Sequence, residues 1–183
     1  MRKVFIGGSR QITKLNAQVR QRLDQIIEKE LEVLIGDANG ADKAVQQYLH
    51  TRSYRRVLVF CSNGTCRNNI GRWETRAIPA PRGATGFEYY SAKDRQMARE
   101  ASVGFMLWDG HSRGTLANII RLLDDQKKVV VYLRASDGFA TVKTKRELEQ
   151  LLAHLGVRKH KAARDQSHPP VGRETNLRQE RLF

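Results

Sequence analysis

Three short segments combine glycines with polar side chains, and each follows an apolar run typical of a buried strand. They are residues 7–10 (GGSR), 36–42 (GDANGAD) and 108–115 (WDGHSRGT). Glycine lets the backbone approach a ligand closely. The unpaired N–H groups at the start of a helix carry a partial positive charge and suit phosphate or another anion. Together the three segments favour a phosphorylated ligand.

The third segment, residues 108–115, has the most complete anion-binding pattern. An apolar run precedes it and a helical pattern follows, so Ser112 is expected to cap the helix. Arg113 adds a cation at the same turn. In the structural alternative this is an ordinary strand-to-helix connection, in which Asp109 only accepts N–H bonds within the turn. None of the three segments is a Walker A loop or a complete Gly-x-Gly-x-x-Gly fingerprint, so the prediction depends on all three.

The apolar pattern predicts alternating strands and helices that position these segments. Strands are predicted at residues 4–6, 32–35, 56–60, 103–107 and 127–133, and helices at 15–31, from 39 onward, 90–101, up to 125, and 144–155. This alternation predicts an α/β fold, a Rossmann-like doubly wound sheet of about five mainly parallel strands with helices on both faces. Such sheets bind ligands at the carboxyl ends of their strands, where the three segments are expected to meet.

Residues 61–87 break this pattern, because they show no sustained period. Loops of this length in compact domains are commonly functional or disordered. We interpret the stretch as a lid, a dimer arm or both, with Trp73 as part of a ligand lid. Cys61 and Cys66 lack the second ligand pair of a zinc site, so no metal is predicted. We interpret them as ordinary loop and strand-end cysteines, with a redox pair as the alternative.

Length and composition indicate one globular domain with a basic appendage. The 183 residues are 40% hydrophobic and carry a formal net charge of +14. We divide them into a nucleotide-binding domain, residues 1–156, and a basic, flexible tail, residues 157–183. No apolar run approaches the roughly 18 residues of a membrane span, so we expect a cytoplasmic protein with no membrane contact. The positive charge favours phosphorylated partners, including nucleic acid bound through the tail.

Four stretches of the chain resemble the motifs of a known family. They are residues 8–10 (GSR), 40–42 (GAD), 93–97 (KDRQM) and 108–115. As a set they resemble the SLOG superfamily, and most of all its DUF2493 or YspA-like branch. The superfamily also includes the Lonely Guy phosphoribohydrolases and the DNA-processing protein DprA. The resemblance implies a domain that binds a nucleotide or a nucleotide-derived ligand, such as a nucleoside monophosphate, NAD or ADP-ribose, commonly as a dimer.

The resemblance and the three segments together predict the walls of a ligand site. Gly114 and Thr115 would hold phosphate, and Arg95 resembles an arginine that Lonely Guy enzymes place near the substrate. Asp42 has a structural alternative, since a carboxylate at a helix start is favoured by the helix dipole. The expected ligand-binding residues are Gly7, Gly8, Ser9, Arg10, Asp37, Gly40, Asp42, Arg95, Asp109, Gly110, Ser112, Arg113, Gly114, Thr115 and Asn118.

One position departs from the Lonely Guy pattern. The motif Pro-Gly-Gly-x-Gly-Thr-x-x-Glu of those enzymes ends in a glutamate that is important for cleaving the N-glycosidic bond, and Asn118 stands at the matching position. An amide cannot act as a carboxylate base. Another carboxylate could take this role, and the unranked candidates are Asp109, Asp94, Glu88 and Glu74. In the structural alternative, Asp94 and Arg95 pair on a solvated helix face that also carries Lys93.

Three functions follow as hypotheses. The first is an enzyme that hydrolyses the N-glycosidic or phosphate part of a nucleotide, and the second is a sensor that binds a nucleotide without turning it over. The third, as in DprA, is binding of single-stranded nucleic acid, which the net charge of +14 would favour. Because the glutamate of the Lonely Guy motif is missing, the sensor is favoured over the enzyme.

Overall fold

The computed structural model describes residues 2–157, which form one seven-stranded sheet. The strands are β1 (Lys3–Gly8), β2 (Glu32–Gly36), β3 (Val57–Ser62), β4 (Glu74–Ile78), β5 (Val103–Trp108), β6 (Val129–Leu133) and β7 (Gly138–Val142). Their order is β4-β3-β2-β1-β5-β6-β7, and all neighbours are parallel except β7, which runs antiparallel to β6. The predicted α/β class and mainly parallel sheet are confirmed, with two strands more than expected.

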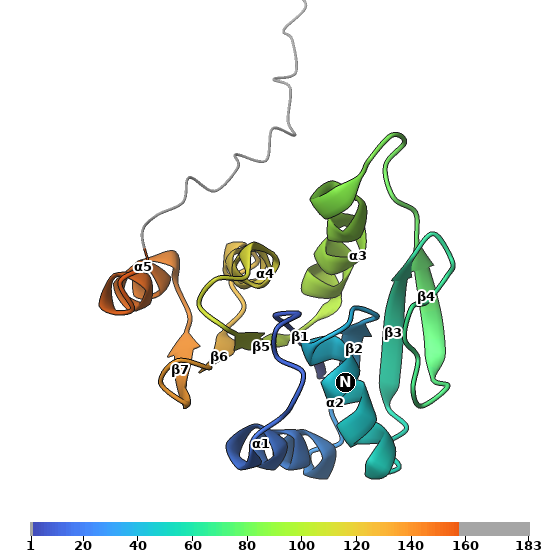
Figure 1. Ribbon diagram of the computed structural model, residues 1–183, viewed down its shortest axis with the longest axis horizontal. Helices are drawn as coiled ribbons and strands as arrows, with labels where there is room; N and C mark the ends of the chain where they lie inside the picture. Colours follow the sequence, from blue (N-terminus) through green and yellow to red (C-terminus); the bar gives the residue numbers. More distant parts are fainter. Residues whose placement is uncertain (1, 158–183) are drawn as a thin grey trace, which may run out of the picture.

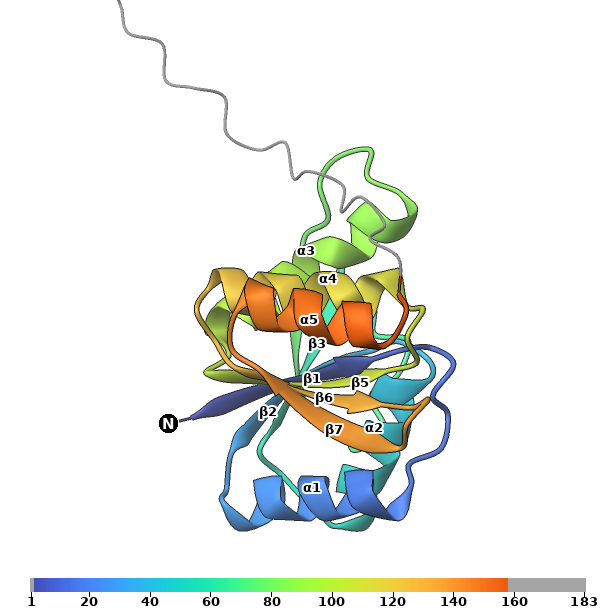
Figure 2. The same ribbon diagram turned by 90° about the vertical axis from the view of Figure 1, so that its left-hand side faces the viewer.

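Helices cover both faces of the sheet. They are α1 (Ala17–Glu28), α2 (Ala41–Thr51), α3 (Gly86–Glu100), α4 (Arg113–Asp124) and α5 (Lys145–His154). α1 and α2 lie on one face, and α3, α4 and α5 on the other (Figures 1 and 2). In β1, Val4 and Ile6 pack with the α1–α2 side, whereas Phe5 packs with the opposite side. Because successive strand residues point to opposite faces, a strand covered on both sides is apolar throughout.

Side-chain caps begin α1 and α4, and the second of them confirms the predicted Ser112 cap. The side chain of Asn16 accepts a hydrogen bond from Val19 N at the start of α1, and Ser112 does the same for Thr115 N at the start of α4. Each cap satisfies a backbone donor that has no partner within its helix. The helix predicted at residues 90–101 begins earlier, at Gly86.

The stretch at residues 61–87 contains strand β4, which the sequence pattern did not predict. The lid prediction for Trp73 is wrong. Its indole Nε1 donates to the backbone oxygen of Tyr54 at 2.8 Å, and its ring packs against the apolar cluster on the α1–α2 side. The prediction of ordinary cysteines is also wrong, because Cys61 and Cys66 are joined by a disulfide with Cα atoms 5.0 Å apart.

The order of the strands reverses at β1. The chain runs from β1 outward through β2 and β3 to β4, then returns through α3 to β5 on the other side of β1. In doubly wound sheets a crevice opens where the order reverses, outside the carboxyl ends of the two strands concerned. Here these strands are β1 and β5, which end at Gly8 and Trp108.

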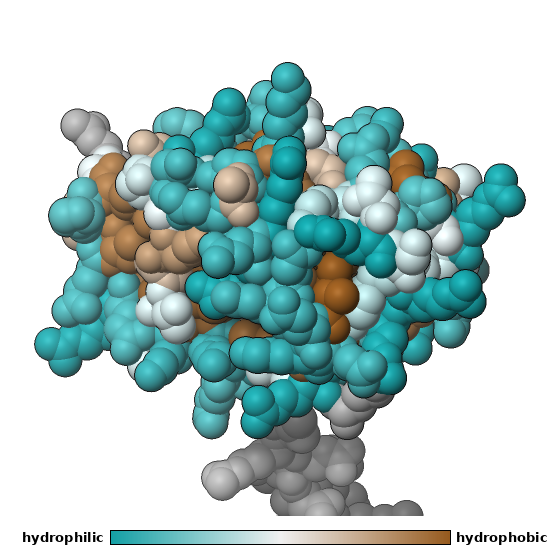
Figure 3. Space-filling model, turned by 90° about the horizontal axis from the view of Figure 1, so that it is seen from below, coloured by the Kyte–Doolittle hydropathy of each residue, from teal (hydrophilic) through white to brown (hydrophobic). Residues whose placement is uncertain are grey.

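Polar side chains cover most of the face on the side of α1 and α2, with smaller apolar patches among them (Figure 3). Phe87 is the one exposed large hydrophobic residue within residues 2–157. No helix in this part of the chain is long and apolar enough to cross a membrane. The predicted basic tail lies outside the described residues apart from Val157.

Candidate functional site

The three glycine-containing segments meet at the carboxyl edge of the sheet, as predicted. Ser9 N donates to the backbone oxygen of Leu107 at 2.9 Å, which joins the ends of β1 and β5. Ala41 N donates to the backbone oxygen of Ser9 at 3.1 Å, which joins the start of α2 to the same point. These bonds fix the relative positions of the first, second and third segments without any ligand.

Two of the site glycines are required by the packing of the chain on itself. A Cβ at Gly8 would lie 2.4 Å from the backbone oxygen of Leu107, and one at Gly40, whose φ is +83°, would lie 2.3 Å from that of Arg10. Gly110 and Gly114 differ, because a Cβ at Gly110 would meet no atom of the described residues within 4 Å, and one at Gly114 would meet only the Phe87 ring at 3.9 Å. Open space beside the backbone therefore lies at the turn before α4 and at its first turn.

Asp109 holds the turn between β5 and α4. Its carboxylate accepts hydrogen bonds from Ser9 Oγ at 2.5 Å, His111 N at 3.0 Å and Ser112 N at 2.7 Å. Burial acts to raise the pKa of Asp109, but these donors outweigh it and hold the pKa below its ordinary value. Ser9 is itself 1% exposed and its hydroxyl is committed to this bond. Both residues thus position the loops.

The first turn of α4 presents unpaired backbone donors. Ser112 Oγ accepts from Thr115 N at 3.3 Å and from Thr115 Oγ1 at 2.9 Å, so both groups of the buried Thr115 serve the cap. The backbone N–H groups of Arg113 and Gly114 have no hydrogen-bond partner within residues 2–157. The Arg113 side chain is exposed. Free N–H groups, a helix start and an adjacent cation together suit an anion.

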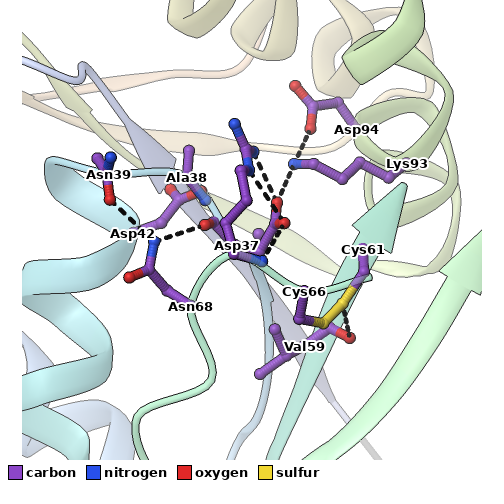
Figure 4. Close-up of polar contacts among 12 residues, drawn as sticks. Asp37, Ala38, Asn39, Asp42, Val59, Cys61, Cys66, Asn68, Lys93 and Asp94 are labelled. Atoms are coloured by element: carbon purple, nitrogen blue, oxygen red, sulfur yellow. Dashed lines mark hydrogen bonds and ion pairs between the residues drawn. A yellow bond between two sulfur atoms is a disulfide. The ribbon is translucent and has the colours of Figure 1, made fainter. Parts of the chain in front are cut away.

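Lys93 is buried among carboxylates beneath this edge, so the solvated-face alternative for its helix is wrong (Figure 4). The residue is 3% exposed, and its Nζ lies 2.9 Å from Asp94 Oδ1 and 3.8 Å from Asp37 Oδ1. A Cβ at Gly36 would lie 2.7 Å from Lys93 Nζ and 2.5 Å from Asp42 Oδ2, so only glycine leaves room for these groups. Helical spacing alone could not reveal this burial.

The charges of this cluster shift one another's pKa values. Burial acts to lower the pKa of Lys93, but Asp94, Asp42 and Asp37 outweigh it and raise the pKa above its ordinary value. Burial raises the pKa of Asp42 from 3.8 to about 6, although Lys93 opposes the rise. The cluster therefore contains a fixed cation and a carboxyl group that titrates near neutral pH.

Arg67, which the sequence interpretation did not identify, clamps the end of β2. Its backbone N and Nε each lie 3.1 Å from Asp37 Oδ2, and its Nη2 lies 2.8 Å from Asp37 Oδ1. Its guanidinium lies 4.4 Å from the ring centre of Tyr90, and that of Arg10 lies 5.6 Å from the same ring. Burial acts to raise the pKa of Asp37, but Arg67 and Lys93 lower it below its ordinary value.

Asn118 connects α4 to the lysine cluster on α3. This residue is 6% exposed; its Nδ2 donates to Asp94 Oδ2 at 3.1 Å, and its Oδ1 accepts from Arg121 Nη1 at 2.7 Å. Asp94 thus receives donors on both carboxylate oxygens, from Lys93 and from Asn118. The amide at the position of the expected glutamate supports a carboxylate that comes from the neighbouring helix.

Two of the catalytic candidates lie apart from this cluster. Glu88 is exposed in the first turn of α3. Glu74 begins β4 beside Leu58, at the opposite, amino edge of the sheet, where it lines a concavity of about 610 Å³ together with Arg55 and Arg72. Glu74 therefore cannot act with the three segments. Arg95 is half-buried on α3, and no hydrogen bond or ion pair with another described residue ties it to the cluster.

Comparison with known proteins adds no assignment. No family model matches the chain, and no curated protein sequence matches it. Within residues 2–157 no group of three or more histidine, cysteine, aspartate or glutamate side chains could hold a metal ion. The function is therefore inferred from the residues at the carboxyl edge.

Proposed function

We propose that the carboxyl edge of the sheet binds a nucleotide or a nucleotide-derived ligand of the nucleoside monophosphate, NAD or ADP-ribose type. The observation that carries the proposal is that free backbone donors and a half-buried carboxylate lie together at the point where strand order reverses. Gly114 N and Arg113 N have no partner within the described chain, and Asp94 lies beside α4 through Asn118. A phosphate needs donors, and ribose hydroxyls need acceptors.

The phosphate is assigned to the first turn of α4. Gly114 leaves space at the backbone, and the exposed Arg113 and Arg10 add positive charge to the rim. Arg67 contributes less, because Asp37 neutralises it. An anion at this position gains both the N–H groups and the helix dipole.

The sugar is assigned to the carboxylate of Asp94. Its partner Asn118 stands four residues after Gly114 on α4, and four residues of helix span about 6 Å. That length is comparable to the separation of a 5′-phosphate from the ribose hydroxyls. One ligand can therefore reach the helix start and the carboxylate together.

Binding without turnover is the form of the proposal that the residues support best. Asn118 supplies no carboxylate, and Asp109 is occupied by three hydrogen-bond donors. Hydrolysis of the N-glycosidic bond is the second candidate, and the geometry favours Asp94 for it over Asp109, Glu88 and Glu74. Cleavage of this bond is the activity of the Lonely Guy enzymes, members of the SLOG superfamily that the motifs resemble. Single-stranded nucleic-acid binding is supported by the net charge of +14, by the basic tail and by the resemblance to the superfamily that includes DprA.

The test is a thermal-shift screen of nucleoside mono- and diphosphates, NAD and ADP-ribose, followed by calorimetric titration of any hit. We expect at least one of them to raise the melting temperature and Arg10→Ala to weaken its binding. Arg20→Ala is the matched control, because Arg20 is exposed on α1, on the other face of the sheet. No shift with any of them in the folded protein would reject the proposal. Chemically unchanged ligand after incubation would support the sensor over the enzyme.

A further inference from the structure

The Cys61–Cys66 disulfide lies next to the proposed ligand site and has no part in the function proposed above. Cys61 is the penultimate residue of β3 and is 1% exposed, whereas Cys66 is half-buried in the following loop. The intervening residues 63–65 are exposed, so a thiol can approach from the side of Cys66. These are the chain's two cysteines.

The disulfide anchors the residue that clamps Asp37. Arg67 follows Cys66 directly, and its backbone N and guanidinium bind the Asp37 carboxylate. The guanidinium also lies over the Tyr90 ring, at 4.4 Å from its centre. Because Cys66 is tied to β3, the start of this clamp cannot move away from the sheet (Figure 4).

A second anchor holds the other side of Arg67 independently of the disulfide. Asn68 Nδ2 donates to the backbone oxygen of Asp37 at 2.8 Å and to Asn39 Oδ1 at 3.0 Å. Gln46 Nε2 donates to the backbone oxygen of Asn68 at 3.3 Å. None of these bonds involves a cysteine, so they still hold Asn68 when the disulfide is open. Any displacement of the backbone on opening is therefore confined to the residues before Asn68.

We propose that Cys61 and Cys66 form a reversible dithiol–disulfide site whose reduction releases Arg67 from Asp37 and Tyr90. The co-reactant is a small or protein dithiol. In a reducing compartment, the disulfides that form are commonly transient, as catalytic or redox-sensing bonds. The consequence for ligand binding rests on the proposed function, but the release of Arg67 does not.

Reduction takes place in two thiol–disulfide exchange steps. A thiolate of the reductant attacks Cys66 Sγ, the S–S bond breaks, and Cys61 leaves as a thiolate that takes up a proton. The second thiol of the reductant then attacks the mixed disulfide and releases Cys66 as a thiolate, which is protonated in turn. The protein gains two electrons and two protons, and the reductant becomes a disulfide. A disulfide oxidant reverses the same steps.

Release of Arg67 opens the proposed ligand site. In the oxidised protein the guanidinium covers the Tyr90 ring and occupies the Asp37 carboxylate. We place the base of the ligand on the Tyr90 ring, which lies beside Arg10 at the rim of the proposed site. A base that stacks there must displace Arg67, so only the fraction of protein in which Arg67 is released can bind, and the apparent affinity falls in proportion to that fraction. The reduced protein is therefore expected to bind the ligand more tightly, by about tenfold if Arg67 is bound in about 90% of the oxidised protein.

The test measures hydrogen–deuterium exchange in the full chain after treatment with oxidised glutathione or with dithiothreitol. We expect the Arg67 amide to exchange about tenfold faster after reduction, as for the loss of roughly 1.4 kcal/mol of protection. The Ser9 amide, bonded to Leu107, should be unchanged. The double variant Cys61→Ser/Cys66→Ser should match the reduced protein and show no response to dithiothreitol, which separates the disulfide from other effects of the reagent.

Two results would overturn the redox site. One is reaction of both cysteines with iodoacetamide after treatment with oxidised glutathione, and the other is equal Arg67 exchange in the two forms. Equal nucleotide affinity in both forms would overturn its control of binding. If Arg67 exchange responds to dithiothreitol but no nucleotide binds either form, the redox site is supported and the nucleotide proposal fails.

Discussion

Lys93 and Asp42 face each other over Gly36, and their burial sets the chemistry of the site at the scale of single residues. A buried lysine keeps its charge when carboxylates surround it, and here Asp94 and Asp37 complete the set. Three carboxylates and the cations of Lys93 and Arg67 then lie within one cluster. Because these charges nearly balance, a polar ligand can form hydrogen bonds with the cluster without having to neutralise a large net charge.

The titration of Asp42 makes a specific prediction for stability. Its pKa is about 6 in the folded protein and 3.8 as the ordinary value, so between these values the folded state binds more protons than the unfolded chain. Stability from this group is therefore present at low pH and is lost as pH rises through about 6. Asp42→Asn keeps the shape and cannot titrate. We expect the free energy of unfolding of the natural protein, relative to Asp42→Asn, to fall by about 2 kcal/mol between about pH 4 and pH 7.

Urea unfolding of both proteins across this range is the measurement. A difference that stays constant with pH, or that grows in favour of the natural protein as pH rises, would contradict the assignment of a raised pKa to Asp42.

Prediction from the sequence reached some of these residues and not others. Ser112 and Asp109 lie close together in one strand–turn–helix unit of the sequence. Their positions in this unit are enough to predict that Ser112 caps the helix and to offer the alternative that Asp109 only accepts N–H bonds within the turn. Lys93 and Arg67 were missed, because their roles come from packing between segments far apart in the chain. Arg67 lies 30 residues from the Asp37 that it binds.

At the scale of elements, α4 positions the proposed phosphate site through its first turn. The Ser112 cap satisfies the N–H of Thr115 and leaves those of Arg113 and Gly114 for a ligand. Ser112→Ala removes the acceptor for both Thr115 groups. We expect this change to destabilise the protein by about 1 kcal/mol, and Ser112→Thr, which keeps a hydroxyl, to recover most of the loss.

Chemical denaturation of the three proteins compares these values. Equal stability of Ser112→Ala and the natural protein would show that the cap contributes little, and the free donors at the helix start would then lack their fixed geometry.

The elements that the sequence pattern failed to predict share one property. β4 and β7 are five-residue strands at the two edges of the sheet, each with a single neighbour. Apart from Val142 their residues are at most half-buried, so neither shows the apolar run by which the central strands are predicted. The central strands and all five helices were predicted because burial on both faces, or on one helical face, leaves a periodic pattern.

At the scale of the whole molecule, strand order and net charge contribute separately to the binding of anionic ligands. The reversal at β1 brings the ends of β1 and β5 together, and this placement is local to the carboxyl edge. The net charge of +14 acts over the whole surface and attracts any polyanion. Charge alone therefore does not distinguish a nucleotide site from nucleic-acid binding.

A binding experiment with single-stranded oligonucleotides distinguishes the proposed nucleotide site from a surface that binds nucleic acid. We expect any such binding to weaken steeply with salt, to persist in Arg10→Ala, and to disappear when residues 158–183 are removed. Fluorescence anisotropy at several salt concentrations measures it. Loss of oligonucleotide binding in Arg10→Ala would instead place nucleic acid at the carboxyl edge and favour the alternative function.

The most direct measurement is an NMR titration of the isotope-labelled protein with the nucleotide that gives the largest thermal shift. If phosphate binds at the start of α4, the backbone amides of Arg113 and Gly114 should show the largest changes in chemical shift, with smaller changes at Arg10. The amides of Arg55 and Arg72, beside the concavity at the opposite edge, should not move. Changes centred on Arg55 and Arg72, with Arg113 and Gly114 unchanged, would contradict nucleotide binding at the carboxyl edge.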